Sequence, residues 1–145
     1  MAYKRKTWEE KMHNGREAVI ERLDKTFTDI PAGSTMLIAT PEIVDAYIRN
    51  IPEGVHTSLQ QMRKDLAATY HADHTCPVTS GIFLRIVAEN AYEQYMKGTP
   101  VSKITPFWRM IDIKSPTLKK LTFGTDFVKQ QWAKEGLTWY PAVRL

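Results

Sequence analysis

The densest group of side chains able to do chemistry lies just before the middle of the chain: His71, Asp73, His74 and Cys76. These residue types bind transition metals, but structural zinc sites take their ligands as two separated pairs, and no second pair is present. We therefore predict a polar connector here and no metal site. A reactive thiol is the alternative, because Cys76 precedes a predicted helix, whose dipole lowers a thiol pKa, and His71 and His74 are the nearest bases.

The positive charge of the chain is concentrated toward its C-terminus. Residues 101–145 carry eight lysines and arginines against three acidic residues. Such an excess suits either an anionic partner, such as a nucleic-acid backbone, or a solvated surface. The single cysteine excludes an internal disulfide framework, and no apolar run is long enough to span a bilayer. We expect a cytoplasmic protein that needs no cofactor and does not enter a membrane.

Hydrophobic periodicity and capping residues predict a mainly α protein with a small β component. Residues 8–28 read as one helix with a possible break near Asn14-Gly15, and the apolar run Met36–Ala39 fits either a strand or a buried turn. Further helices are predicted over residues 41–50, 58–70, 77–97 and 127–135, the last one capped by Asp126 and ended by Gly136. The tail Trp139-Tyr140-Pro141 is expected to pack back on the domain.

Two of the predicted helices form a pair. Thr57 or Ser58 can cap the first, and Thr79 or Ser80 can cap the second, whose inward face would include Ile82 and Ile86. Two helices joined by a short connector are the helix-turn-helix pattern. With Lys119-Lys120 in a loop that would act as a wing, the sequence predicts a winged helix-turn-helix domain over residues 51–145. Residues 1–50 would be an N-terminal helical segment packed on it.

Several short motifs follow one another in a recognisable order. They are Ile51-Pro52-Glu53-Gly54 before a capped helix, Thr99-Pro100, then Pro106-Phe107-Trp108-Arg109, and finally Phe123-Gly124, Lys129 and Glu135-Gly136. This order resembles the DNA-binding half of the alkylguanine-DNA alkyltransferases, where Ile-Pro-x-Gly, Asn-Pro, Pro-Cys-His-Arg and a closing Glu-Gly occur at similar spacing. The resemblance covers about residues 50–137, and it implies a winged-helix fold and duplex DNA as the partner.

The departures from this family concern its chemistry. Phe107 stands at the position of the acceptor cysteine and Trp108 at that of the activating histidine, and neither supplies a thiolate or a base. Leu59 replaces a tyrosine, and the base-flipping arginine falls on Asn90, or on Thr79 or Ser80 if the helix is extended at its start. We therefore expect no alkyltransferase activity. The chain is more similar to the alkyltransferase-like proteins, which bind alkylated DNA without an acceptor cysteine and pass the lesion to repair proteins.

The sequence predicts two groups of site residues. The residues expected to contact duplex DNA are Ser58, Thr79, Ser80, Arg85, Arg109, Lys119 and Lys120. A lesion pocket would be formed by Pro106, Phe107, Trp108 and Glu135, with the two aromatic rings either stacking on a base or filling the core.

Other functions remain open from the sequence. The first is a protein-interaction module that kept the fold and lost DNA binding. The second is a thiol transferase that uses Cys76. If the protein binds DNA, a repair protein would be a further partner.

Overall fold

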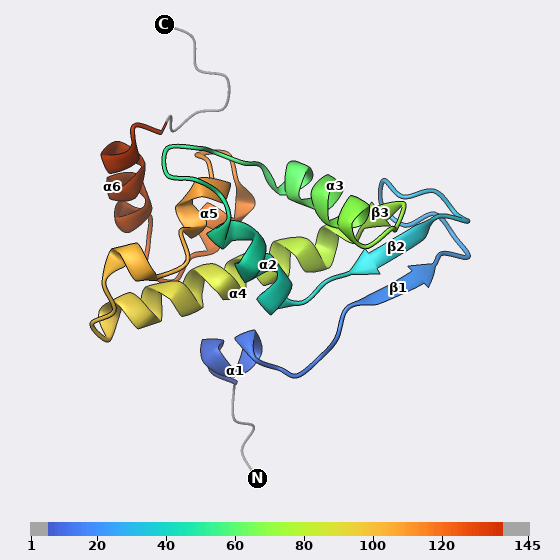
Figure 1. The fold of residues 1–145 in the computed structure, drawn as a ribbon, viewed down its shortest axis with the longest axis horizontal. Helices are drawn as coiled ribbons and strands as arrows, with labels where there is room; N and C mark the ends of the chain where they lie inside the picture. Colours follow the sequence, from blue (N-terminus) through green and yellow to red (C-terminus); the bar gives the residue numbers. More distant parts are fainter. Residues whose placement is uncertain (1–5, 138–145) are drawn as a thin grey trace, which may run out of the picture.

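Helices dominate the part of the chain that this computed structural model describes, residues 6–137, and a small three-stranded mixed sheet lies at one end (Figure 1). The expected fold class, mainly α with a small β component, is confirmed. In chain order the elements are α1 Trp8–Met12, β1 Val19–Arg22, β2 Thr35–Ile38, α2 Pro41–Arg49, α3 Leu59–Thr69, β3 His74–Thr75, α4 Pro77–Met96, the 3-10 turns η1 Val101–Lys103 and η2 Phe107–Met110, α5 Pro116–Lys120 and α6 Asp126–Glu135. The predicted contacts of the tail Trp139-Tyr140-Pro141 lie outside the described residues.

The N-terminal region differs from the prediction of one helix over residues 8–28. Helix α1 begins with a capping box between Thr7 and Glu10 and ends at Met12, close to the Asn14-Gly15 break. Gly15 has a φ of +76°, in the left-handed region that glycine adopts without steric cost. Strand β1 follows instead of a second helical stretch, because the branched Val19 and Ile20 pair with β2.

The sheet has the order β1-β2-β3. Strand β1 pairs antiparallel with β2, from Val19 opposite Ile38 to Arg22 opposite Thr35. Strand β2 pairs parallel with the two-residue β3, which sits between α3 and α4. The apolar run Met36–Ala39 therefore contributes to a strand, and its Leu37 is fully buried. The sheet attaches the N-terminal region to the connector between α3 and α4.

Helices α3 and α4 form the predicted pair, with one correction to their caps. Ser58 caps α3 by accepting a hydrogen bond from Gln61 N at 3.0 Å. Helix α4 begins at Pro77 as expected, where the fixed φ of proline suits a helix start, but its N-cap position is held by Cys76. Thr79 and Ser80 therefore lie inside the helix, and neither caps it. The Ser80 hydroxyl instead donates to Cys76 O at 2.6 Å.

The hydrophobic core surrounds α4, which lies at the centre of the molecule (Figure 1). Leu84, Val87, Ala88 and Ala91 face the core from α4, and the other helices and the η2 turn pack around them. Helix α1 packs on another side of α4. Within residues 6–137, no helix is long and apolar enough to cross a membrane.

The C-terminal part of the described chain corrects two predictions. Lys119 and Lys120 do not lie in a wing loop but in the short helix α5, which starts at Pro116 and buries Thr117 and Leu118. Within residues 6–137, no strand follows α4. Helix α6 starts at Asp126, which is its first residue and not its cap; its end at Gly136, with a φ of 69°, is as predicted.

Candidate functional site

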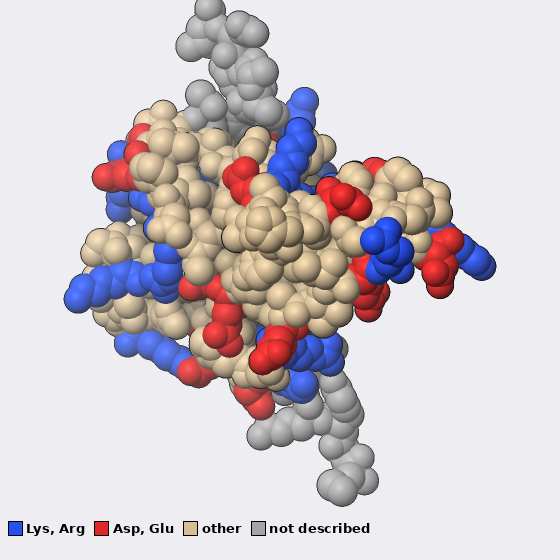
Figure 2. Space-filling model, turned by 45° about the vertical axis from the view of Figure 1, so that its right-hand side comes forward, with Lys and Arg blue, Asp and Glu red and all other residues tan. Residues whose placement is uncertain are grey.

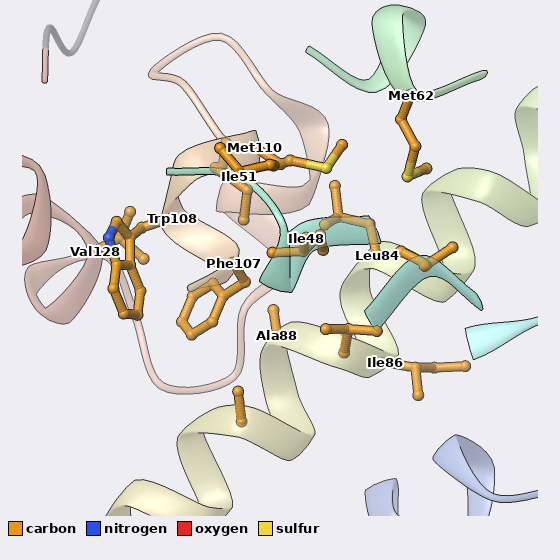
Figure 3. Close-up of a cluster of buried hydrophobic side chains, with 14 of the residues drawn as sticks. Ile48, Ile51, Met62, Leu84, Ile86, Ala88, Phe107, Trp108, Met110 and Val128 are labelled. Atoms are coloured by element: carbon orange, nitrogen blue, oxygen red, sulfur yellow. The ribbon is translucent and has the colours of Figure 1, made fainter. Parts of the chain in front are cut away.

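The turn that was expected to form a lesion pocket is part of the core. Phe107 is fully buried and Trp108 is 3% exposed. The Phe107 ring lies 5.4 Å from the Trp108 ring and 6.0 Å from the Phe127 ring, centroid to centroid. Figure 3 shows Phe107 among the packed apolar side chains, close to Ala88 of α4. The ring is therefore not available to stack on a base, and the core reading of Phe107 is the one that the geometry supports.

Glu135 at the end of α6 holds this turn in place. Its carboxylate accepts hydrogen bonds from Trp108 Nε1 at 2.8 Å, from Arg109 Nε and Nη2 at 2.9 and 2.8 Å, and from Gly54 N at 3.0 Å. The Arg109 contact is bidentate, the strongest form of this ion pair. The third Arg109 nitrogen, Nη1, donates to Ile51 O at 2.8 Å. One carboxylate thus joins η2, α6 and the loop that follows α2.

The protonation of Glu135 reflects this environment. Burial alone raises the pKa of the carboxyl group, but the hydrogen bonds from Arg109, from Gly54 N and from Trp108 outweigh it, and the resulting pKa lies below the ordinary value. The carboxylate is therefore charged at neutral pH and fully engaged. Each of the three Arg109 side-chain nitrogens likewise donates to an internal acceptor, so this guanidinium is not free to bind a phosphate group.

At the position that the sequence resemblance suggests for the base-flipping residue, α4 has no side chain that is free to reach a DNA base. Asn90 is 7% exposed, on the side of α4 that faces the core. Its neighbour Glu89 is also buried and accepts from Thr122 N at 2.7 Å and from Thr122 Oγ1 at 2.6 Å. These contacts fasten α4 to the chain segment before α6, so this stretch of the helix is structural.

A mostly apolar groove of about 670 Å³ lies beside the first half of α4. We call it the α4 groove. Helices α1, α3, α4 and α5 all contribute to its lining. Its apolar lining includes Leu59, Pro77, Val78, Ile82, Ile86 and Pro116. Val78 and Ile82 are each 51% exposed, although Ile82 was expected to face inward. These two side chains form a half-exposed apolar strip beside the groove.

Basic side chains border the α4 groove. Lys11, Arg85 and Lys120 come from α1, α4 and α5, and no acidic residue of the described chain lines the groove. The Trp8 ring lies between two of these cations, 4.4 Å from Lys11 Nζ and 5.3 Å from Arg85 Cζ. A net positive rim around an apolar floor is therefore the chemical character of this surface.

Two unsatisfied polar atoms lie on α4, and one of them belongs to the groove-lining Arg85. Thr79 Oγ1 and Arg85 Nε are buried and have no hydrogen-bond partner among residues 6–137. Buried polar groups without partners are uncommon and costly in native proteins. Neither α4 nor α5 has a side-chain hydrogen bond at its cap, and both helices start at prolines that line the groove. The groove thus combines apolar surface with unused hydrogen-bonding capacity.

The structure brings together only part of the predicted DNA-binding set. Arg85 and Lys120 line the α4 groove, and Lys119 is exposed on the same short helix as Lys120. Thr79 lies in the first turn of α4. Ser80 and Arg109 are occupied by the internal bonds described above, and Ser80 is 1% exposed. Ser58 accepts from Gln61 N but stays exposed, whereas the Thr79 hydroxyl oxygen is buried. A surface contact with phosphate is therefore open to Ser58, Arg85, Lys119 and Lys120.

Sequence reasoning missed Trp8, Lys11, Val78 and Ile82 as groove residues. A signal for two of them was present, because Val78, Ile82 and Arg85 follow one another at helical spacing on one face of α4. Nothing in the sequence indicated that α1 would lie beside this face. The short length of α1 and its break at Asn14-Gly15 indicate a wall of the groove only once the packing of α1 on α4 is known.

The cluster before α4 does not form a metal centre in the part of the chain that is described. Among residues 6–137, no three His, Cys, Asp or Glu side chains are arranged to hold a metal ion. Asp73 instead accepts from Thr35 N at 2.9 Å, and Thr35 Oγ1 accepts from Asp73 N at the same distance. Cys76 is 3% exposed and packs with Ile30 and Met36. These residues join the connector to the sheet.

Charge on the molecular surface is mixed. On the face drawn in Figure 2, basic and acidic side chains are interspersed, and no continuous basic surface extends across it. A second hollow, of about 420 Å³, lies beside Pro106 and Trp108 and is lined by both signs of charge, including Arg49, Glu53 and Lys134. The α4 groove is therefore the surface with the most uniform charge among the hollows described here.

Comparison of the chain with protein-family models, with curated proteins and with solved structures finds no match.

Proposed function

We propose that this protein is a non-catalytic interaction module that binds a segment of a partner protein in the α4 groove. The observation that carries the proposal is the groove itself, where Val78 and Ile82 leave half of their surface in water beside 670 Å³ of open space. Binding sites for apolar ligands are concave and bring a few polar groups to a mostly apolar lining. Arg85 and Lys120 supply such groups here.

The scaffold of this module is, in our proposal, that of the alkyltransferase DNA-binding half. Helices α3 and α4 would be its helix-turn-helix pair, with α5 in place of a wing. The bond from Trp108 Nε1 to Glu135 supports this relation, because these two residues stand where the family has its histidine and its closing glutamate. The contact would survive as a structural bond after the chemistry was lost.

The absence of transferase activity follows from the same residues. Phe107 has no nucleophile, and Trp108 has no basic nitrogen to activate one. Cys76 is buried in the sheet cluster, where a large alkylated base has no access. Protein incubated with radiolabelled methylated DNA should therefore remain unlabelled. Label transferred to the protein would contradict the proposal, and peptide mapping would show whether Cys76 carried it.

Partner binding is tested by selecting peptides from a random displayed library on the wild-type protein. We expect enriched peptides whose binding is lost on Ile82→Asp, because a carboxylate placed on the groove floor opposes burial of apolar side chains. Ile82 is half exposed, so this variant should keep its fold, which circular dichroism would check. Ile20→Asp is the matched control, since Ile20 is 46% exposed on β1, outside the groove. Failure to enrich any peptide, or equal binding to Ile82→Asp, would reject the proposal.

Duplex DNA is the second candidate ligand, favoured by the cations that meet at the start of α4. Lys11, Arg85, Lys119 and Lys120 come from three helices, and each could neutralise a phosphate. A duplex is a convex polyanion, however, and would leave the apolar floor of the groove uncovered. Fluorescence anisotropy on plain and alkylated duplexes at two salt concentrations separates the two candidates. DNA binding predicts a steep loss with salt, and a larger one for wild type than for Lys119→Ala with Lys120→Ala.

A further inference from the structure

The charge around the α4 groove restricts the kind of partner that fits it. Three cations, Lys11, Arg85 and Lys120, line the groove, and no acidic residue of the described chain does so. The uncapped start of α4 adds the positive end of a helix dipole at Pro77. A partner with basic residues along its edges would be repelled from this rim. Electrostatic complementarity therefore favours acidic side chains on either side of an apolar strip.

The secondary structure of the lining restricts the partner further. Every lining residue that the structure describes belongs to a helix, α1, α3, α4 or α5. Beyond the first turns of α4 and α5, the backbone N–H and C=O groups of these helices bond to one another, so the groove offers no continuous ladder of free backbone groups to an extended peptide. The edges of the sheet are formed by β1 and β3, and neither strand contributes to the groove. A partner must therefore satisfy its own backbone, as a helix does.

The position of the exposed apolar residues agrees with a helical partner. Val78 and Ile82 lie one turn apart on α4, and Arg85 follows on the same face, where its unpartnered Nε is buried beside the groove. A helix that lies across this face can insert apolar side chains at i, i+3, i+4 and i+7 between α4 and α5. Acidic residues on the flanks of the partner helix would then reach Arg85 on α4 and Lys11 on α1 or Lys120 on α5.

We propose that the α4 groove binds an acidic amphipathic helix of a partner protein. This inference rests on the proposed function and adds the partner's charge and conformation. The apolar strip of the partner helix covers Val78 and Ile82, and its carboxylates pair with the basic rim. The guanidinium of Arg85 gains an acceptor for its buried Nε, and the Trp8 ring holds that guanidinium toward the groove.

The test uses three synthetic peptides on the full chain, measured by fluorescence anisotropy. All have leucines at i, i+3, i+4 and i+7, and the flanking positions hold glutamate, glutamine or lysine. We expect the glutamate peptide to bind about tenfold more tightly than the glutamine peptide, because three partly exposed ion pairs each add a modest amount. The lysine peptide should bind most weakly. A glutamate peptide with a central proline, which breaks the helix, should lose binding.

Charge reversal on the protein supplies the decisive arm. Lys11→Glu with Lys120→Glu should turn the preference from the glutamate peptide to the lysine peptide. Both side chains lie at the groove rim and make no ion pair among the described residues, so the fold should tolerate the change. Lys11 loses its contact with the Trp8 ring, and circular dichroism checks that the fold is kept. Lys103→Glu, an exposed lysine on η1 outside the groove lining, is the control and should leave the preference unchanged.

The outcomes separate this inference from the proposed function. Equal binding of the three peptides, a preference for lysine in the wild type, or tolerance of the proline peptide would overturn the acidic helix. If library peptides still bind and lose affinity on Ile82→Asp, the interaction module stands and only the partner's character is wrong. If neither library nor synthetic peptides bind, both fail. A fourth outcome would assign the basic rim to DNA. In it, a short plain duplex displaces the bound glutamate peptide, and the protein shows no preference among the three peptides.

Discussion

The Pro106–Arg109 turn and the α4 groove differ in how they use the same kinds of side chain. Each has an arginine, aromatic surface and nearby aliphatic residues. In the turn, Arg109 is bound by Glu135 and Ile51 O, and Phe107 is fully buried. In the groove, Arg85 retains a buried Nε without a partner among residues 6–137, and Val78 is half exposed.

The difference shows where binding capacity remains in this molecule. A turn whose charges and rings are all satisfied internally gains little from a ligand, because each contact would replace an existing one. A groove with exposed apolar area and an unsatisfied donor gains from burial. The sequence resemblance indicated the turn as the candidate site, whereas the geometry favours the groove.

The largest expected effect in this comparison is the loss of the Phe107 ring. Phe107→Ala should destabilise the protein by roughly 3–5 kcal/mol, because it removes a fully buried ring from a packed core. Urea denaturation followed by circular dichroism measures this change. A loss under about 1 kcal/mol would mean that the ring lines a pocket, and it would remove the contrast between the two regions.

Removal of the charge on Glu135 should cost somewhat less. Glu135→Gln leaves the largely buried guanidinium of Arg109 without its counter-charge, and we expect a loss of roughly 2–4 kcal/mol. Glu53→Gln is the matched control, since Glu53 is exposed beside the same hollow, and it should change stability by about 0.5 kcal/mol or less. Equal effects of the two variants would show that the Arg109 contact does not hold the turn.

The same carboxylate predicts a pH dependence. The pKa of Glu135 is lower in the folded protein than in the unfolded chain, so its contribution to stability is present above the unfolded value of about 4.3 and is lost as the pH falls through the folded value. The pKa values of Asp29, Asp65 and Asp73 are also lowered, by hydrogen bonds from Arg63, Tyr47 and Thr35 respectively.

Acid should therefore destabilise the wild type, and Glu135→Gln should make that loss less steep without abolishing it. Denaturation midpoints between about pH 6 and about pH 3 provide the measurement. An identical slope in the two proteins would argue that Glu135 is not charged in the folded turn.

The smallest effect on stability is expected in the groove. Ile82→Ser should cost about 1 kcal/mol or less, because half of the side chain is already in water. Thermal unfolding of this variant beside Phe107→Ala tests the contrast directly. A cost as large as that of Phe107→Ala would show that Ile82 supports the core, and the groove would lose its role as a binding surface.

Local signals in the sequence predicted much of the helical framework. Ser58 was correctly expected to cap α3, and Gly136 to end α6, because both act through bonds and backbone angles within a few residues. The same local reasoning failed for residues 8–28, where apolar residues at helical spacing did not reveal that Val19 and Ile20 would pair with a distant strand. It failed as well for Lys119 and Lys120, where Pro116 starts a helical turn in place of a wing.

The candidate site was less accessible to the sequence than the fold. Residue type alone indicated that Phe107 and Trp108 supply neither a nucleophile nor a base at the positions that the family resemblance implies. Composition and spacing also placed Arg85 and Lys120 in one functional set. They could not indicate that Ser80 and Arg109 would be consumed by internal hydrogen bonds, because those bonds join Ser80 to Cys76 O and Arg109 to Glu135.

The sequence by itself determined helices α2, α3, α4 and α6, the positive excess and the lack of a nucleophile in the Pro106–Arg109 turn, because each is a property of near neighbours or of side-chain type. Only the tertiary structure decided which basic and apolar residues share a surface. Lys11, Ile82 and Lys120 are far apart in the chain, and they meet because α1 and α5 both lie beside α4. Packing chooses which side chains are satisfied and which remain free to bind, and that choice has no local signature.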